Sequence, residues 1–213
     1  MLDTHCPLCL NSAVSDYHRD TSRQYLQCGR CDLVFVARRY LPSKSTERGE
    51  YDKHRNDPAD QGYRDFLSRL AVPLMERVPA GASGLDFGCG PGPALVQMLR
   101  EAGYAVALYD SFYAPDNAVL ETSYDFVCAT EVVEHLHNPG AELDRIWRLL
   151  RPAGWLAVMT KLVRNPEAFA GWHYIRDITH VCFFSEATWF WWAREYGARL
   201  EFIGADVILL QRQ

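Results

Sequence analysis

From residue 80 onward, short apolar runs alternate with stretches whose apolar positions recur at helical spacing. The short runs, typical of buried strands, are SGLDF, AVALYD, YDFVCAT and WLAVMT. The stretches with the period of helices are PALVQMLREAG, AELDRIWRLLRPAG and SEATWFWWAREYG. Alternation of this kind predicts a doubly wound, mainly parallel α/β sheet with helices on both faces. The last run, ARLEFIGADVILLQRQ, predicts a closing antiparallel hairpin.

Before residue 80 the pattern changes twice. QYLQC and CDLVFVARRY predict short strands within residues 1–41. Residues 42–60 are polar and predict a linker, whereas YRDFLSRLAVPLMERV has apolar positions at helical spacing until Pro73, which bends the helix. The chain is therefore expected to divide into a small β module (1–41), a linker and helical cap (42–79) and the α/β domain (80–213).

Composition and charge narrow the class of protein. A chain of 213 residues with 48% hydrophobic residues can fill a core, which excludes a disordered protein. A net charge of -5 provides no overall field for a polyanion, so a nucleic-acid partner is disfavoured. The chain has neither a secretory signal nor an apolar run of about 20 residues, and we expect a cytoplasmic protein without a membrane partner.

Four of the seven cysteines form two C-x2-C pairs, Cys6 with Cys9 and Cys28 with Cys31. Their separation lies within the range of zinc sites, and four thiolates close a tetrahedral Zn²⁺ shell with no open position. Both pairs lie on turn-like sequence, CPLC and CGRC, so accidental pairs of buried cysteines are a weaker explanation. We expect residues 1–41 to form a zinc ribbon with a structural Zn²⁺.

The stretch GLDFGCGPGPAL follows the first predicted strand of the α/β domain. A dinucleotide turn requires G-x-G-x-x-G, with the third glycine beneath a pyrophosphate, but here Pro93 stands in that place. Asp86 puts a negative charge at the strand end, where two phosphates would lie. The turn therefore suits a cationic or zwitterionic ligand better than a pyrophosphate.

LDFGCGPG resembles the first motif of class I S-adenosylmethionine-dependent methyltransferases, and the resemblance covers roughly residues 60 to 213. Asp110 ends the second strand, where an acid is able to bind both ribose hydroxyls, and the terminal hairpin also matches this Rossmann-like fold. The resemblance implies S-adenosylmethionine as cofactor. The residues that it implies for cofactor binding are Asp86, Gly88, Cys89, Gly90, Asp110, Ser111, Thr130, Glu131, Val132 and, as a lid together with Arg64, Tyr63.

Glu131, Glu134 and His135 form an E-x-x-E-H pattern, whose spacing puts three ligand-type side chains on one face of a helical turn. The pattern is similar to that of ubiquinone-pathway O-methyltransferases and small-RNA 2′-O-methyltransferases, where it binds a divalent metal. In the RNA group a later histidine completes the shell, and His180 is the comparable residue here. The alternative stays open that no metal binds, with His135 packed and Glu134 exposed.

Other residues are weaker candidates for the pocket. His54 is a candidate general base, although a lone histidine in a polar linker is usually only solvated. With His135 and His180 it completes the candidate catalytic residues. Further pocket candidates are Tyr51, Trp172, Tyr174 and Asp177. WFWW (189–192) is expected in the core, and Cys89, Cys128 and Cys182 are expected to be small buried hydrophobes.

These features together predict methyl transfer from S-adenosylmethionine to a small hydroxylated metabolite, with O-methylation favoured and divalent-metal assistance left open. The ribbon resembles those fused to bacterial methyltransferases of sugar and natural-product pathways. One alternative is an RNA methyltransferase, whose ribbon would present a basic stripe of Arg23, Arg30, Arg38, Arg39, Lys44 and Arg48. Another is a non-catalytic binding module. The acceptor atom and the oligomeric state do not follow from the sequence.

Overall fold

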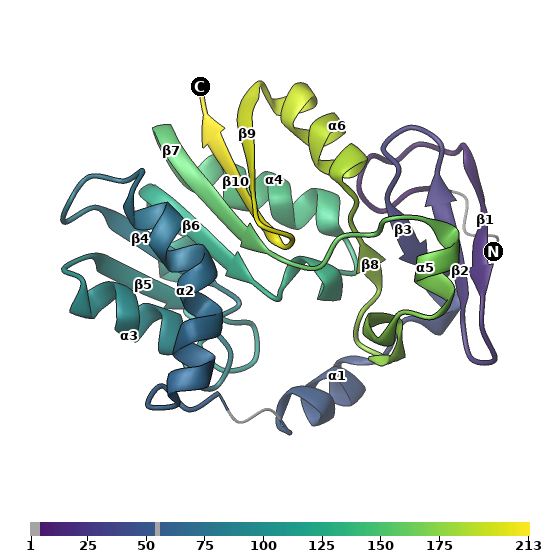
Figure 1. The fold of residues 1–213 in the computed structure, drawn as a ribbon, viewed down its shortest axis with the longest axis horizontal. Coiled ribbons are helices and arrows are strands. Elements are labelled where there is room, and N and C mark those ends of the chain that lie inside the picture. The colour runs from purple at the N-terminus through teal and green to yellow at the C-terminus, as the bar shows by residue number, and fades with distance from the viewer. Residues whose placement is uncertain (1–4, 54–55) are drawn as a thin grey trace.

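The computed structural model describes residues 5–53 and 56–213, so His54 lies outside the described residues. The chain forms a six-stranded sheet and a four-stranded sheet, seen side by side in Figure 1. The strands are β1 (Val14–Arg19), β2 (Gln24–Cys28), β3 (Val34–Val36), β4 (Ser83–Phe87), β5 (Ala105–Tyr109), β6 (Tyr124–Thr130), β7 (Leu150–Met159), β8 (Cys182–Phe183), β9 (Ala198–Ile203) and β10 (Val207–Arg212). The α-helices are α1 (Lys44–Tyr51), α2 (Gln61–Met75), α3 (Ala94–Glu101), α4 (Pro139–Leu149), α5 (Pro166–Ala170) and α6 (Glu186–Tyr196). Short 3-10 helices are η1 (Arg38–Tyr40), η2 (Asn117–Glu121), η3 (Val133–His135) and η4 (His173–Arg176).

The six-stranded sheet has the order β5-β4-β6-β7-β10-β9. The pairs among β5, β4, β6 and β7 are parallel, and β10 runs antiparallel to both β7 and β9. Side chains alternate along β7, because Leu156 and Val158 join one buried cluster while Ala157 and Met159 join the other. Helices α2 and α3 cover one face, and α4 and α6 cover the other (Figure 1). The predicted fold class, including the terminal hairpin, is confirmed.

Part of the expected linker is a helix. Ser43 caps α1 by accepting a hydrogen bond from the Thr46 amide, and Glu47 is buried although α1 is a polar helix. Ser and Thr favour turns and helix caps over helix interiors, so a short polar segment that contains them is predicted to be a linker. Such a short segment becomes helical only when one of its faces packs against a neighbouring part of the protein.

The small sheet has the order β1-β2-β3-β8 and is antiparallel throughout. Its fourth strand comes from far along the chain: Val34 pairs with Phe183 and Phe35 with Cys182. The expected module over residues 1–41 therefore shares its sheet with the segment after β7. This pairing covers the backbone of β3, whose hydrogen-bonding edge would otherwise be open. No helix in the described part of the chain is long and apolar enough to cross a bilayer.

Candidate functional site

A cavity of about 880 Å³ lies at the carboxyl ends of β4, β5 and β6. Ligands of doubly wound sheets bind at this edge. The lining includes most of the residues singled out in the sequence: Tyr51, Tyr63, Asp86, Gly88, Cys89, Gly90, Asp110, Ser111, Thr130, Glu131, Val132, His135, Asp177 and His180. Residues from distant parts of the chain therefore meet in one cavity.

The glycine turn after β4 depends on the absence of side chains. Gly88 has φ +80°, and a Cβ there would lie 2.5 Å from Val132 Cγ2. At Gly92 a Cβ would lie 1.9 Å from the carbonyl oxygen of Asn56. The turn is thus packed against two segments of the cavity wall, and its backbone faces the cavity at close range.

Asp86 is buried at the end of β4, with 4% of its surface exposed. Burial, and next the charge of Asp110, raise the pKa of its carboxyl to about 7. A cationic group in the cavity would favour the ionised form and offset this cost of burial. Tyr63, on α2, lines the same region, and burial followed by the charges of Asp86 and Glu131 raises its pKa to about 12.

Asp110 organises the loop after β5. Its Oδ2 accepts a hydrogen bond from the Gly90 amide at 3.0 Å, and its Oδ1 accepts from the amides of Phe112 and Tyr113 at 2.8 and 3.1 Å. The carboxylate thereby ties the glycine turn to the neighbouring loop at the cavity wall. The sequence suggested a ribose ligand for Asp110 but not this bracing of Gly90.

Aromatic rings line the other end of the cavity. The ring of Tyr51, on α1, lies 5.8 Å from that of Phe112 and 5.3 Å from that of His135, both edge to face. Phe112 was not identified from the sequence, although it directly follows the Asp110 loop that was. On α1, Glu47 Oε1 lies 2.9 Å from His137 Nε2. Helix α1 is therefore part of the cavity wall.

Glu134, His135 and His180 bring one ligand atom each within 4.8 Å of one another. The Nδ1 of His180 lies 2.8 Å from the Tyr174 carbonyl oxygen, and that of His135 lies 3.1 Å from the Thr179 carbonyl oxygen. A carbonyl oxygen accepts only, so each Nδ1 carries a proton, and in the neutral imidazole the lone pair is then on Nε2. This tautomer is the one that a metal-binding imidazole needs.

Glu134 is 1% exposed, so its carboxylate is buried, and the exposed position that the metal-free alternative gave it is wrong. Its Oε1 accepts a hydrogen bond from the Tyr174 hydroxyl, while Oε2 is buried without a hydrogen-bond partner among the described residues. Burial, and next the charge of Glu131, raises the pKa of Glu134 to about 8. A buried oxygen without a partner, beside two imidazoles, fits a divalent cation.

Glu131 is not among the ligand atoms that converge with Glu134, His135 and His180. Its carboxylate lies 3.5 Å from the Tyr174 hydroxyl, so the two carboxylates share this tyrosine. Its φ of +52° is in the left-handed region, which is unusual for a residue with a side chain. Glu131 therefore lines the cavity beside the cluster and supports it through Tyr174.

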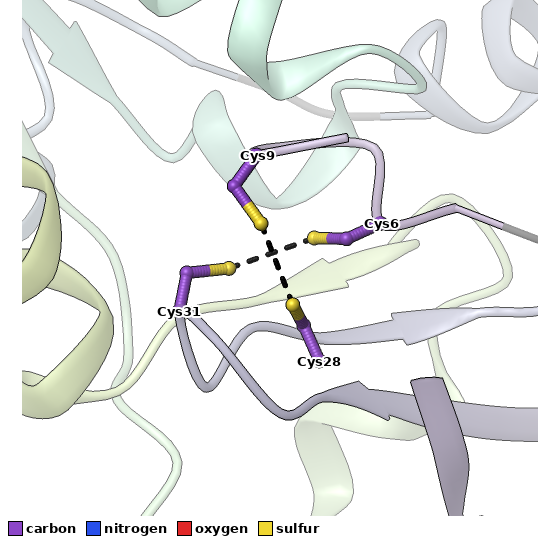
Figure 2. Close-up of side chains that lie close together, drawn as sticks. All are labelled: Cys6, Cys9, Cys28 and Cys31. Carbon is purple, nitrogen blue, oxygen red and sulfur yellow. Dashed lines mark hydrogen bonds between the residues drawn. The ribbon is translucent and has the colours of Figure 1, made fainter. Parts of the chain in front are cut away.

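The four ribbon cysteines converge on one point, as Figure 2 shows. Their Sγ atoms all lie within 4.8 Å of one another, with Cys6 and Cys31 at 3.5 Å and Cys9 and Cys28 at 3.4 Å. The structure describes all seven cysteines, and none of them forms a disulfide. Tetrahedral thiolates with Zn–S bonds near 2.3 Å lie roughly 3.8 Å apart, so the donor set fits Zn²⁺.

Several other candidates lie elsewhere. Arg64 does not cover the cavity but pairs with Glu101 at the surface. Trp172 lines a second hollow, of about 550 Å³, between the ribbon hairpin and the segment after β7. In the WFWW run Trp189 and Trp192 are buried as expected, whereas Phe190 is exposed. Cys89, Cys128 and Cys182 are buried as expected.

The model of the methyltransferase domain family matches residues 51–201. The biotin biosynthesis bifunctional protein BioCD of Bordetella avium is 27% identical, over 65% of this chain and 32% of the relative. A ubiquinone biosynthesis O-methyltransferase of Xanthomonas oryzae pv. oryzae is 34% identical, over 43% of this chain and 47% of the relative. The chain thus spans one third to about half the length of these two relatives.

A solved structure supports the fold. The 1,6-didemethyltoxoflavin-N1-methyltransferase of Burkholderia thailandensis, with its substrate and S-adenosylhomocysteine bound, superposes with a TM-score of 0.53. The match covers 93% of this chain and 99% of that one at 16% identity, which is a likeness of fold. With the family match over most of the chain, we conclude that this protein belongs to the methyltransferase domain family and has the class I S-adenosylmethionine-dependent methyltransferase fold.

Proposed function

We propose that the protein transfers a methyl group from S-adenosylmethionine to a hydroxyl group of a small molecule. The observation that carries the proposal is the buried carboxylate of Asp86 beside the Gly88 turn, at the carboxyl edge of the sheet. This combination fits the cationic aminoacid end of S-adenosylmethionine and opposes a pyrophosphate. When bound, the cofactor would supply a methyl group on a positively charged sulfur.

Different residues around the Gly88 turn would contact different parts of the cofactor. Asp86 would stabilise positive charge on the cofactor, and Asp110 would accept hydrogen bonds from ribose hydroxyls while it holds Gly90. Tyr63 lines the cavity from α2, and Val132 lies against the turn at Gly88. A cavity formed in this way limits the orientations of donor and acceptor.

We further propose that Glu134, His135 and His180 hold a divalent cation at the acceptor end. Two imidazoles and one carboxylate suit transition metals such as Fe²⁺, Co²⁺ or Zn²⁺. Such a cation lowers the pKa of a bound hydroxyl and orients its oxygen. The O-methyltransferase name of the Xanthomonas oryzae relative supports an oxygen acceptor. The rings of Tyr51 and Phe112 next to His135 would pack against an apolar part of the acceptor.

The RNA alternative loses a central residue of its expected basic stripe. Arg23 is 7% exposed, and its guanidinium donates hydrogen bonds to carbonyl groups inside the protein. Arg30, on the same ribbon, pairs with Glu195. A small-molecule acceptor therefore accounts better for the arrangement of charges.

Cofactor binding tests the first proposal. Titration calorimetry with S-adenosylmethionine should give measurable binding by the protein, and Asp86→Asn should weaken it about tenfold or more because the cationic group of the cofactor loses its anionic partner. Asp65→Asn is the matched control, since Asp65 lies on the exposed side of α2. Screening hydroxylated small molecules with methyl-labelled cofactor would then identify the acceptor. Lack of cofactor binding by the unaltered protein would refute this function.

Metal analysis tests the second proposal. Purified protein should contain one ribbon zinc and one further divalent ion, and His135→Gln or His180→Gln should remove only the further ion. His173→Gln serves as control, because His173 is exposed and lies beside Lys161. A single ion per chain, together with turnover that chelators leave unchanged, would exclude the second site.

A further inference from the structure

Arg23 lies in the turn between β1 and β2 of the ribbon but is buried against the segment after β7. Its guanidinium donates hydrogen bonds to the carbonyl oxygens of Ile175, Asp177, Ile178 and His180. Those to Asp177, Ile178 and His180 measure 3.0, 3.1 and 3.0 Å. Four carbonyl dipoles thus point at one cation. A planar guanidinium with five donors is the side chain that satisfies such an arrangement.

The loop that Arg23 gathers carries side chains of the cavity. Asp177 and His180 line the acceptor end, and the His180 amide donates to the Asp177 carbonyl at 3.3 Å. The same loop region sets the imidazole orientation, because His180 Nδ1 donates to the Tyr174 carbonyl at 2.8 Å. A change in the path of this loop would therefore rotate or displace the His180 ring.

Backbone contacts connect the ribbon to the opposite side of the cluster. The Val36 amide donates to the Val181 carbonyl at 2.9 Å, and the Val181 amide donates to the Glu134 carbonyl at 2.7 Å. The Gly140 amide donates to the Pro7 carbonyl in the first cysteine turn at 3.2 Å. A Cβ at Gly140 would lie 2.4 Å from the Leu8 carbonyl oxygen, so the zinc turn packs directly on the start of α4.

We infer that Arg23 is a positioning residue of the active site, which holds the 175–180 loop so that His180 faces Glu134 and His135. The ribbon then has a role beyond its own folding, because it holds the loop whose Asp177 and His180 line the acceptor side of the cavity. A role of Arg23 in catalysis rests on the proposed function. The hold of Arg23 on the 175–180 loop is testable without any acceptor.

Three variants of the full, zinc-loaded chain test this link. Arg23→Met keeps the stem and removes all donors, whereas Arg23→Lys keeps the charge but lacks the planar fork. Arg30→Met is the matched control, because Arg30 is a partly exposed arginine of the same ribbon that pairs with Glu195. Zinc content identifies folded ribbons. If Arg23→Met loses zinc, Arg23→Lys is compared with the unaltered protein in its place.

Hydrogen exchange and imidazole nitrogen NMR give the readouts. Arg23→Met should increase amide exchange in residues 173–182 about tenfold or more. The His180 signal, assigned with His180→Gln, should change from one tautomer to a mixture. Arg23→Lys should lie between the two, and Arg30→Met should match the unaltered protein. Affinity for S-adenosylmethionine should stay within about twofold in all variants, since the glycine turn lies at the other end of the cavity.

Unchanged exchange over 173–182 and an unchanged His180 tautomer in zinc-loaded Arg23 variants would overturn the inference. An equal effect in Arg30→Met would overturn it as well, because the effect would then belong to the ribbon in general. If the unaltered protein fails to bind S-adenosylmethionine, the proposed function fails, while exchange and NMR still decide whether Arg23 positions the loop.

Discussion

Asp86 and Glu134 are both buried carboxyl groups, but their surroundings assign them different tasks. Asp86 stands beside the glycine turn, and burial with the nearby charge of Asp110 raises its pKa. Glu134 stands beside two imidazoles and a tyrosine hydroxyl. The first arrangement suits an organic cation, and the second suits a metal ion. At the scale of single residues, the ligand that suits each end of the cavity depends on one acidic residue and its neighbours.

Cofactor affinity should depend on pH through Asp86. Its pKa of about 7 is above the usual value, so the carboxyl loses its charge as pH falls through 7, and a cationic ligand loses its partner. Asp110, Tyr63, Cys89 and Cys128 are the titratable groups whose charges interact with it. Affinity should therefore fall between about pH 7 and pH 5.5, by up to about tenfold per pH unit.

Calorimetry across this range checks the expectation. The ligand's amino group stays protonated there, since α-amino groups titrate near pH 7.7 to 8.0. Asp86→Asn should show weak binding with a nearly flat profile, and Asp65→Asn should follow the unaltered protein. A flat profile for the unaltered protein would assign the cationic contact to another group.

At the scale of elements, the turn between β4 and α3 combines backbone conformation with close packing. Gly88 and Gly81 both have positive φ, +80° and +74°. A side chain at Gly88 meets Val132, whereas within 4 Å of a Cβ at Gly81 no atom of the described residues is found. A substitution at Gly81 therefore introduces backbone strain alone, whereas one at Gly88 introduces backbone strain and a steric clash with Val132.

Gly88→Ala and Gly81→Ala should both lose about 1–2 kcal/mol of unfolding free energy through the left-handed conformation. Gly88→Ala should lose roughly 1–3 kcal/mol more through overpacking against Val132. Urea denaturation measures both losses. Only Gly88→Ala should also weaken binding of S-adenosylmethionine, and equal stability losses in the two variants would contradict the close packing of the turn.

Across the whole molecule, the ribbon and the α/β domain are joined by shared structure. Strand β8 completes the ribbon sheet, and Arg23 binds the loop before it. One buried cluster contains ribbon residues such as Phe35 together with Leu156 of the central sheet. Loss of the zinc ion proposed for the four-cysteine site should therefore affect the cavity as well as the ribbon.

Cys9→Ser should lose the ribbon zinc, because a structural site with three thiolates binds the ion far more weakly. Its melting temperature should fall, and exchange in residues 173–182 should rise, since this loop depends on the ribbon. Cys128→Ala is the control: Cys128 is buried in β6, away from the cluster, and its replacement should leave the zinc content of the protein unchanged. A Cys9→Ser protein with the same zinc content as the unaltered protein would contradict the four-cysteine site.

Local patterns in the sequence were sufficient for the strands of the six-stranded sheet with the helices that cover it, for the terminal hairpin and for the convergence of the four cysteines, but β1, β8 and α5 were not predicted. Local patterns were also sufficient for the Asp86 turn, because an acid followed by alternating glycines restricts the backbone locally. Helix α1 was missed, since its polar residues form a helix once Ser43 caps it and Glu47 is buried. Tyr174 was named as a pocket candidate, but its hydrogen bond to Glu134 follows from no local spacing.

The sequence by itself thus determined the cofactor end of the cavity, because the end of β4, the glycine turn and the start of α3 follow one another along the chain. The acceptor end is a product of the tertiary structure, because Tyr51, Glu134 and His180 come from three distant segments. Arg23 is the clearest example of a role that only the tertiary structure decides. The sequence predicts one of several surface cations, whereas in the fold its guanidinium is buried among four carbonyl groups. Burial and long-range hydrogen bonds assign such residues their roles, and neither is encoded in a local pattern.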